Sequence, residues 1–177
     1  MNNLHLELIL GGMRSGKSRI AQQRCASQNK QVVYIATATA GDTEMRDRIE
    51  RHQCDRPNHW RTIEEPIHLA KTLIEHADVN SCLLVDCLTL WVTNLICNDD
   101  AALLESEIKL LLTKIKQLRG TIILVSNETG LGIIPADPIS RRFIDICGRL
   151  HQDLAQLSDT VIYTVAGIPQ FLKSPVE

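Results

Sequence analysis

Gly11-Gly12-Met13-Arg14-Ser15-Gly16-Lys17-Ser18 is the stretch that decides the fold, because it fits G-x-x-x-x-G-K-[ST], the phosphate-binding loop. It follows the apolar run Leu6–Leu10 and precedes a helical pattern, Ser18–Gln28. A strand that delivers the loop and a helix that leaves it make successive backbone N–H groups converge where they bind phosphate oxygens. In such a loop Lys17 reaches the β- and γ-phosphates, and the Ser18 hydroxyl holds Mg²⁺. An ordinary glycine-rich turn is the alternative, and the strand–loop–helix context disfavours it.

Length and composition are those of one globular domain spanning residues 1–177, with 44% hydrophobic and 23% charged residues. The net charge of −2 and the aromatic content of 3% argue against a nucleic-acid partner. No apolar run approaches a membrane span, and the first residues do not open a signal peptide. The six cysteines include no C-x-x-C pair, so we expect reduced thiols in a cytoplasmic protein.

Short apolar runs alternate with helical patterns along the chain. The expected strands are Leu6–Leu10, Val32–Ala36, Cys82–Asp86, Thr121–Val125 and Thr160–Val165, with an extra strand at Trp60–Ile63 and an edge strand or hairpin at Ile168–Lys173. The expected helices are Ser18–Gln28, Thr43–Cys54, Ile67–His76, Ala101–Leu118 and Pro138–Leu157, the last capped by Asp137. Strands that are continuously apolar are covered on both faces. The pattern therefore predicts an α/β fold with a mainly parallel sheet and helices on both faces.

Asp86 closes one of these runs, at the expected carboxyl end of its strand. An acid in that position is how phosphate-loop enzymes hold Mg²⁺. The alternative is an N-cap for a helix starting near Leu88, and the two roles are compatible. Arg14, inside the loop, is a candidate for an additional phosphate contact.

Asn127 and Glu128 follow the run Thr121–Val125 in the same way. Ligands of parallel sheets gather outside the carboxyl ends of the strands, so these side chains are placed to meet a nucleotide or an attacking water. Turn formation ahead of Gly130 explains them equally well. From the residues alone both interpretations stay open.

Six segments occur in one order and together carry a family resemblance. They are Gly11-Gly12-x-Arg14-Ser15-Gly16-Lys17-Ser18, Tyr34-Ile35-Ala36-Thr37-Ala38, Asp42-x-Glu44-Met45-x-x-Arg48-Ile49-x-x-His52, Arg56-Pro57-x-x-Trp60-Arg61-Thr62-x-Glu64, Asp86-Cys87-Leu88-Thr89 with Val92-Thr93-Asn94, and Asn127-Glu128-x-Gly130-x-Gly132-Ile133-x-Pro135. Over nearly its whole length the chain resembles the bifunctional adenosylcobinamide kinase / adenosylcobinamide-phosphate guanylyltransferase family of cobalamin biosynthesis.

The resemblance implies a RecA-like P-loop NTPase fold, a homo-oligomer that is commonly a trimer, and two reactions. In the first, ATP or GTP phosphorylates the hydroxyl of the aminopropanol arm of adenosylcobinamide. In the second, GTP gives its GMP unit to adenosylcobinamide phosphate through a guanylylated histidine. The products are adenosylcobinamide-GDP and pyrophosphate.

The resemblance also assigns residues. Pattern alone favours a solvated surface role for His52 on its charged helix, but the resemblance makes it the catalytic nucleophile. Lys17 is the second expected catalytic residue. Mg²⁺ is expected on Ser18 and Asp86. The implied nucleotide-binding residues are Gly11, Gly12, Met13, Arg14, Ser15, Gly16, Lys17, Ser18, Thr37, Ala38, Thr39, Gln53, Cys54, Asp55, Arg56, Glu64 and Asp86, with Glu64 and the 53–56 stretch on the guanine nucleotide.

Two other functions fit parts of the sequence. A P-loop small-molecule kinase without guanylyl transfer needs only the loop and an acceptor site. A GTP-binding regulatory module also needs the loop, but such switches normally read guanine with N-K-x-D, which this chain lacks. Labelling of the protein by GTP carrying a labelled α-phosphate separates the bifunctional enzyme from both.

Overall fold

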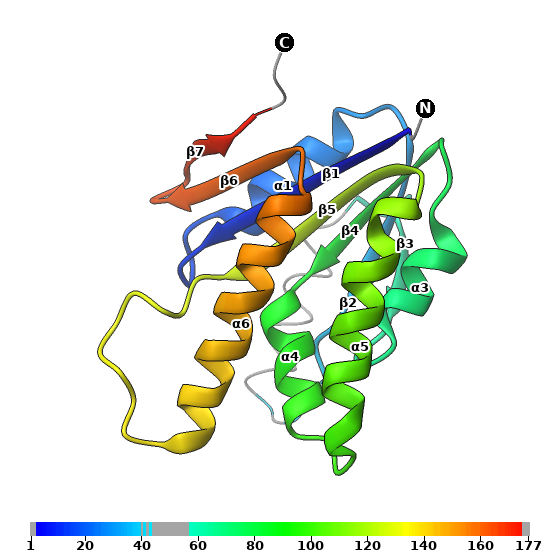
Figure 1. The fold of residues 1–177 in the computed structure, drawn as a ribbon. Helices are drawn as coiled ribbons and strands as arrows, with labels where there is room; N and C mark the ends of the chain where they lie inside the picture. Colours follow the sequence, from blue (N-terminus) through cyan, green and yellow to red (C-terminus); the bar gives the residue numbers. More distant parts are fainter. Residues whose placement is uncertain (1–2, 40, 42, 44–56, 175–177) are drawn as a thin grey trace.

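A seven-stranded sheet carries the fold in the computed structural model, which describes residues 3–39, 41, 43 and 57–174 (Figure 1). The strands are β1 (Leu4–Gly11), β2 (Gln31–Ala36), β3 (Arg61–Glu64), β4 (Ser81–Asp86), β5 (Gly120–Asn127), β6 (Thr160–Val165) and β7 (Ile168–Lys173). The helices are α1 (Lys17–Ala26), α3 (Leu69–His76), α4 (Leu88–Ile96), α5 (Ala101–Lys114) and α6 (Pro138–Leu157), and a 3₁₀ turn (Ile115–Gln117) follows α5.

The strand order is β3-β2-β4-β5-β1-β6-β7, in which only the last pair, β6 with β7, is antiparallel. The predicted, mainly parallel sheet is therefore confirmed. Parallel strands end at the same edge of a sheet, so Gly11, Ala36, Glu64, Asp86 and Asn127 all lie at its carboxyl edge. This edge gathers the polar residues that follow the strands.

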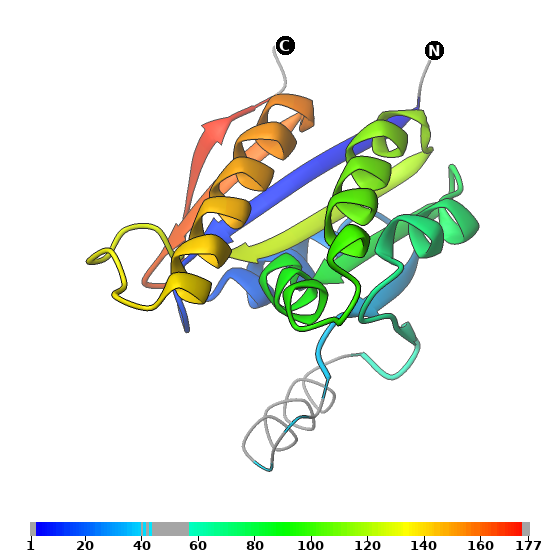
Figure 2. The same cartoon turned by 60° about the horizontal axis from the view of Figure 1, so that its bottom comes forward.

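Helices cover both faces of the sheet, as predicted. Helix α1 lies on one face, and α3, α4, α5 and α6 lie on the other (Figures 1 and 2). Along β1, Leu6 and Leu8 pack into the core beneath the four helices, whereas Ile9 packs into the core beneath α1. This two-sided burial explains why the strands are apolar without alternation. None of the described helices is long and apolar enough to cross a bilayer.

The element boundaries lie close to the predicted ones, and for one helix the sequence predicted only the start, near Leu88. The extra strand begins at Arg61, one residue later than predicted, and Asp137 caps α6 by accepting a hydrogen bond from the Ser140 N–H at 2.8 Å. Helix α4 had a predicted start but no predicted range, because its first turns are mostly apolar and hide the one-sided stripe of a surface helix. The predicted helix Thr43–Cys54 lies, apart from Thr43, outside the described residues.

One ion pair is buried beneath α1 and joins that helix to β1. The Glu7 side chain is fully buried, and Arg24 donates to it from Nε and, at 2.6 Å, from Nη2. The Nε2 atom of His5 lies 2.8 Å from the same carboxylate. Burial acts to raise the pKa of Glu7, but hydrogen bonds from His5 and Arg24 outweigh it and hold the pKa below its usual value. Because α1 leaves the phosphate loop, this pair fixes the helix that completes the loop.

We expect Glu7→Gln to lower the free energy of unfolding by about 3 kcal/mol at pH 7, because it leaves the Arg24 guanidinium without its anion. The folded-state pKa lies below the ordinary 4.5, so this stabilisation is present above that pH and is lost as the pH falls through the folded-state value. Urea unfolding should therefore show the two proteins converging in acid. Glu105→Gln, on the exposed side of α5, is the control. Equal stabilities at pH 7 would contradict the assignment.

Candidate functional site: the phosphate loop and the carboxyl edge

The loop between β1 and α1 has the backbone geometry of an anion cradle. Gly16, directly before α1, has φ +93°, and Arg14 also lies in the left-handed region with φ +57°. A Cβ on Gly11 would lie 2.5 Å from the Ser15 hydroxyl oxygen and 2.6 Å from the Thr164 carbonyl oxygen. Glycine at these positions is therefore required by backbone conformation at Gly16 and by close approach at Gly11.

Lys17 is held as a partly desolvated cation at the start of α1. Its side chain is buried, and its Nζ donates to the Gly12 carbonyl at 3.2 Å. Burial lowers the pKa of Lys17, and the nearby Asp86 carboxylate opposes that shift. The Ser15 hydroxyl is also buried and has no hydrogen-bond partner in the described part of the chain. A buried cation beside an unpaired hydroxyl suits an anionic ligand such as a polyphosphate.

Neighbouring strands brace the loop through its carbonyl groups. The Glu128 N–H, just after β5, donates to the Gly11 carbonyl at 3.0 Å, and the Gly167 N–H donates to the Ser15 carbonyl at 2.7 Å. Gly167 belongs to the two-residue turn between β6 and β7, in which Ala166 and Gly167 have φ of +51° and +79°. Two positive φ values are typical of a tight hairpin turn. Of the two predictions for Ile168–Lys173, an edge strand or a hairpin, the structure has the strand β7 joined to β6 as a hairpin.

Asp86 lies at the end of β4, where the prediction placed it. It accepts a hydrogen bond from the Tyr34 hydroxyl at 3.0 Å and lies near enough to Lys17 to influence its pKa. The predicted alternative, an N-cap for the next helix, is wrong, because Cys87 occupies that position and caps without a side-chain hydrogen bond. The described residues contain no cluster of three or more His, Cys, Asp or Glu side chains that would hold a metal unaided. Mg²⁺ is typically held by one or two protein oxygens together with substrate phosphates, which Ser18 and Asp86 fit.

The segment after β2 is tied to the segment after β4. The Thr37 side chain is buried, and its hydroxyl donates to the Cys87 carbonyl at 2.7 Å and accepts from the Cys87 N–H at 2.9 Å. Asn94 of α4 donates to the Thr37 carbonyl at 2.7 Å, and its amide oxygen accepts from the Thr39 hydroxyl at 3.2 Å. Thr37 and Thr39 therefore shape the edge of the sheet, and their contacts with a nucleotide stay a prediction.

Asn127 and Glu128 meet at the same edge. The Asn127 amide donates to the Thr89 hydroxyl at 3.0 Å, which joins the end of β5 to the start of α4. Glu128 Oε1 accepts from the Gly130 N–H at 2.6 Å, so the turn-forming interpretation of Glu128 is confirmed. Its other oxygen lies 4.0 Å from Nδ1 of the buried His151, whose Nε2 is 2.7 Å from the Ser126 hydroxyl. These contacts of His151 were not predicted, because a single histidine in a helical pattern has no spacing that indicates a role.

The remaining predicted residues fall into two groups. His52, Gln53, Cys54, Asp55 and Arg56 lie outside the described residues. Met13 and Glu64 are exposed, Ala38 is half-buried, and Glu64 ends β3 at the far edge of the sheet. In the order β3-β2-β4-β5-β1, Glu64 is four strand spacings from β1, roughly 19 Å at ~4.8 Å per spacing. The structure thus brings Asp86 to the loop and leaves Glu64 distant from it.

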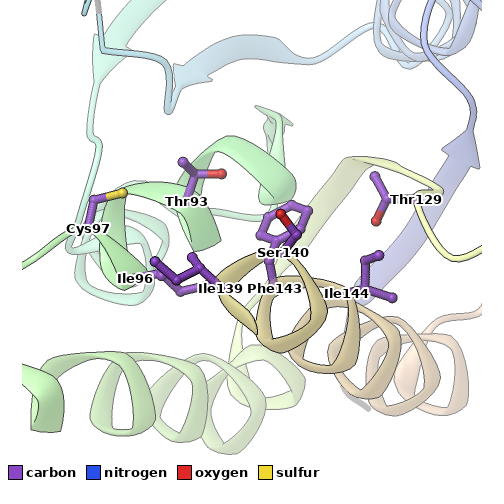
Figure 3. A pocket seen from close by; sticks show the side chains of 8 residues that line it. All are labelled: Thr93, Ile96, Cys97, Thr129, Ile139, Ser140, Phe143 and Ile144. Carbon is purple, nitrogen blue, oxygen red and sulfur yellow. The ribbon is translucent and has the colours of Figure 1, made fainter. Parts of the chain in front are cut away.

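An uncharged cavity of about 280 Å³ opens between α4, α6 and the segment after Glu128. Figure 3 shows Phe143 and Ser140 of α6 facing Thr93 of α4, with Thr129 across the opening. The rest of its lining consists of Ile96, Cys97, Ile139 and Ile144. Sequence reasoning missed this cavity, because its walls come from three segments that are distant along the chain.

The chain matches a family of known sequences over most of its length. Residues 7–172 match the family described as Cobinamide kinase / cobinamide phosphate guanyltransferase. The bifunctional adenosylcobalamin biosynthesis protein CobP of Pseudomonas aeruginosa is 54% identical over 167 residues, covering 94% of this chain and 96% of that protein. The bifunctional protein CobU of Escherichia coli K12 is 39% identical over 176 residues, covering 91% and 96%.

Two solved structures share the fold at low sequence identity. The PH0250 protein of Pyrococcus horikoshii OT3 has a TM-score of 0.57 at 10% identity, covering 98% of this chain and 88% of that one. The RadB recombinase has a TM-score of 0.51 at 16% identity, covering 90% and 73%. The fold is therefore that of the RecA-like phosphate-loop NTPases, as predicted.

Gly11→Ala and Gly12→Ala test the loop geometry as a matched pair. We expect Gly11→Ala to lower the free energy of unfolding by about 1–3 kcal/mol, because its Cβ would overlap the Ser15 side chain and the Thr164 backbone. Gly12→Ala should change it by at most about 0.5 kcal/mol, since no described atom lies within 4 Å of an added Cβ. Urea unfolding without nucleotide measures both. A Gly11→Ala protein as stable as Gly12→Ala would contradict this view of the loop.

Proposed function

This chain belongs to the cobinamide kinase / cobinamide phosphate guanyltransferase family, and we propose that it catalyses both reactions of that family through one triphosphate site. Adenosylcobinamide is first phosphorylated and then receives GMP, which assembles part of cobalamin. The observation that carries the proposal is the braced phosphate loop with its buried lysine, in a chain that matches the family from residue 7 to residue 172.

In the kinase step, the substrate hydroxyl attacks the γ-phosphorus of ATP or GTP and the nucleoside diphosphate leaves. Phosphoryl transfer needs positioning and charge stabilisation more than covalent help from the protein. The N–H groups of the loop and the α1 N-terminus bind the phosphates, and the Lys17 ammonium stabilises the charge that develops on the leaving oxygen. Because Lys17 is partly desolvated, its attraction for phosphate is stronger than that of a surface lysine.

In the guanylyl step, we assign the nucleophile to His52, on the basis of the family resemblance. Its neutral imidazole forms a bond to the α-phosphorus of GTP, and the bond to the pyrophosphate oxygen breaks. A phosphate oxygen of adenosylcobinamide phosphate then attacks the same phosphorus, the P–N bond breaks, and adenosylcobinamide-GDP leaves. The covalent intermediate lets pyrophosphate depart before the second substrate reacts.

Mg²⁺ and the guanine contacts complete the proposed site. Ser18 and Asp86 are the oxygen donors that would hold Mg²⁺ together with phosphate oxygens, and the bound ion would neutralise charge on the leaving group. Glu64 and the stretch Gln53–Arg56 are proposed for guanine, because a carboxylate accepts from guanine N1–H and N2–H₂, which adenine lacks.

We further propose a cytoplasmic homotrimer. The family resemblance supplies the number of subunits and the location. The surface gives independent support for association, because Leu131, Ile133 and Ile134 project from one loop with exposed fractions of 79%, 96% and 80%. Neighbouring exposed apolar side chains mark interaction sites on proteins. Sedimentation equilibrium measures the number of subunits directly.

The covalent step is tested by His52→Asn. We expect this variant to lose protein labelling by α-labelled GTP and to lose guanylyl transfer, while it phosphorylates adenosylcobinamide at a rate within about threefold of wild type, because asparagine cannot form the phosphoramidate. Mass spectrometry of the labelled wild-type protein should find the GMP adduct on His52. His59→Asn, in an exposed turn of the same region, is the matched control and should keep the label. Label that persists in His52→Asn would refute the assignment.

The Mg²⁺ ligand is tested by Asp86→Asn. We expect the Mg²⁺ concentration for half-maximal kinase rate to rise at least about tenfold, because an amide oxygen lacks the carboxylate charge that binds a hard cation. Asp99→Asn, in the exposed turn after α4, should leave that concentration unchanged. EDTA should stop both reactions, and added Mg²⁺ should restore them. An unaltered Mg²⁺ dependence in Asp86→Asn would remove Asp86 from the metal site.

A further inference from the structure

Glu128 is fixed beside the phosphate loop. It follows β5, the neighbour of β1, and Asn127 is the register partner of Gly11. The Glu128 N–H donates to the Gly11 carbonyl at 3.0 Å. The carboxylate therefore starts one strand spacing, roughly 4.8 Å, from the strand that delivers the loop. Any phosphate seated on the loop lies within the reach of one side chain.

The side chain of Glu128 is held by one oxygen and available at the other. Oε1 accepts from the Gly130 N–H at 2.6 Å. Oε2 makes no hydrogen bond within the described ranges, and it lies 4.0 Å from Nδ1 of His151, a histidine whose pKa is lowered by burial. The Glu128 side chain is 24% exposed, so a substrate can reach it, and Thr129 beside it lines the uncharged cavity. One oxygen thus holds the carboxylate in place, and the other can accept a proton, as a general base requires.

The other carboxylates at this edge either accept hydrogen bonds already or lie far from the phosphate loop. Asp86 accepts from Tyr34 and is the proposed Mg²⁺ ligand. Glu64 and Glu65 lie at the end of β3, four strand spacings from β1, and Glu65 already accepts from the N–H groups of Ile67 and His68. Among the described residues of this edge, Glu128 is therefore the carboxylate closest to the loop that is not assigned to metal.

We propose that Glu128 is the proton acceptor of the kinase step, an inference that rests on the proposed function. The substrate hydroxyl oxygen bonds to the γ-phosphorus, and the bond from that phosphorus to the β,γ-bridging oxygen breaks. The bonding electron pair leaves with the nucleoside diphosphate. The hydroxyl proton passes to Glu128 Oε2 and then to solvent.

The role is confined to the first reaction by the chemistry of the nucleophiles. An alcohol holds its proton firmly at neutral pH, so the proton must be removed as the new bond forms. A neutral imidazole attacks through a lone pair, and a phosphate monoester attacks as an anion. Loss of Glu128 as a base should therefore slow phosphorylation and spare guanylylation of the protein.

Glu128→Gln is the sharpest test, because the glutamine amide oxygen can still accept from the Gly130 N–H but cannot take a proton. We expect the kinase kcat with ATP and adenosylcobinamide to fall by about 10²–10⁴-fold, with KM for both substrates within about threefold of wild type. Labelling of the protein by α-labelled GTP should stay within about threefold. Glu128→Asp should lie between the two proteins. Glu65→Gln, another carboxylate of this edge that binds backbone N–H groups, is the matched control and should keep its kinase rate.

Three outcomes would overturn the proposal. A kinase kcat of Glu128→Gln within threefold of wild type would show that no proton passes to this carboxylate. Equal losses of kinase rate and GTP labelling would show that Glu128 only maintains the loop. A wild-type protein that labels with GTP but does not phosphorylate adenosylcobinamide would remove the kinase half of the proposed function, and this proposal with it. The last result is distinguishable because it appears before any variant is made.

Discussion

The site depends on a phosphate loop whose backbone is held by hydrogen bonds from neighbouring segments to its carbonyl groups. Gly11 and Ser15 each give a carbonyl to the N–H of another segment, Glu128 on one side and Gly167 on the other. The β6–β7 hairpin thus has a function beyond the edge of the sheet, because its tight turn supplies one of these donors. The buried pair of Glu7 and Arg24 adds a third restraint by holding α1 on β1. These three contacts restrain the backbone of the loop and of α1 before a ligand binds.

Strand order decides which polar groups can act together. Because β5 and β4 are the first and second neighbours of β1 on one side, Glu128 and Asp86 come close to the loop. Thr37, after β2, reaches the same region by bonding to Cys87, and Asn94 links it to α4. Glu64, at the end of β3, is the outlier. A guanine contact there requires a nucleotide that extends along the edge, away from the loop.

Much of this arrangement was predictable from sequence, for reasons that differ by element. The loop motif and the doubly buried strands leave local signals, namely glycines at fixed spacing and apolar runs without alternation. Helix α4 was predicted only by its start near Leu88, because its mostly apolar first turns weaken the periodicity of a surface helix. The bond from Glu128 to Gly11 and the place of His151 depend on register and packing between segments more than 20 residues apart along the chain, which no local pattern encodes. Asp86 was correctly placed, but its capping alternative could be rejected only from the helix start at Leu88.

The two reactions make different demands on one triphosphate site, and the structure suggests how both are met. Phosphoryl transfer to an alcohol is helped by a base beside the γ-phosphate, and we propose Glu128, whose backbone N–H binds the Gly11 carbonyl of the strand that carries the loop. Guanylyl transfer needs a nucleophile at the α-phosphate and no base, so its residue can come from a separate segment, and the resemblance places it between β2 and β3. In the proposed mechanism the loop, Lys17 and Asp86 serve both reactions, because each reaction expels a phosphate-bearing leaving group. Sequential use of one site therefore requires only that the nucleophile change, while the groups that stabilise the leaving phosphate stay where they are.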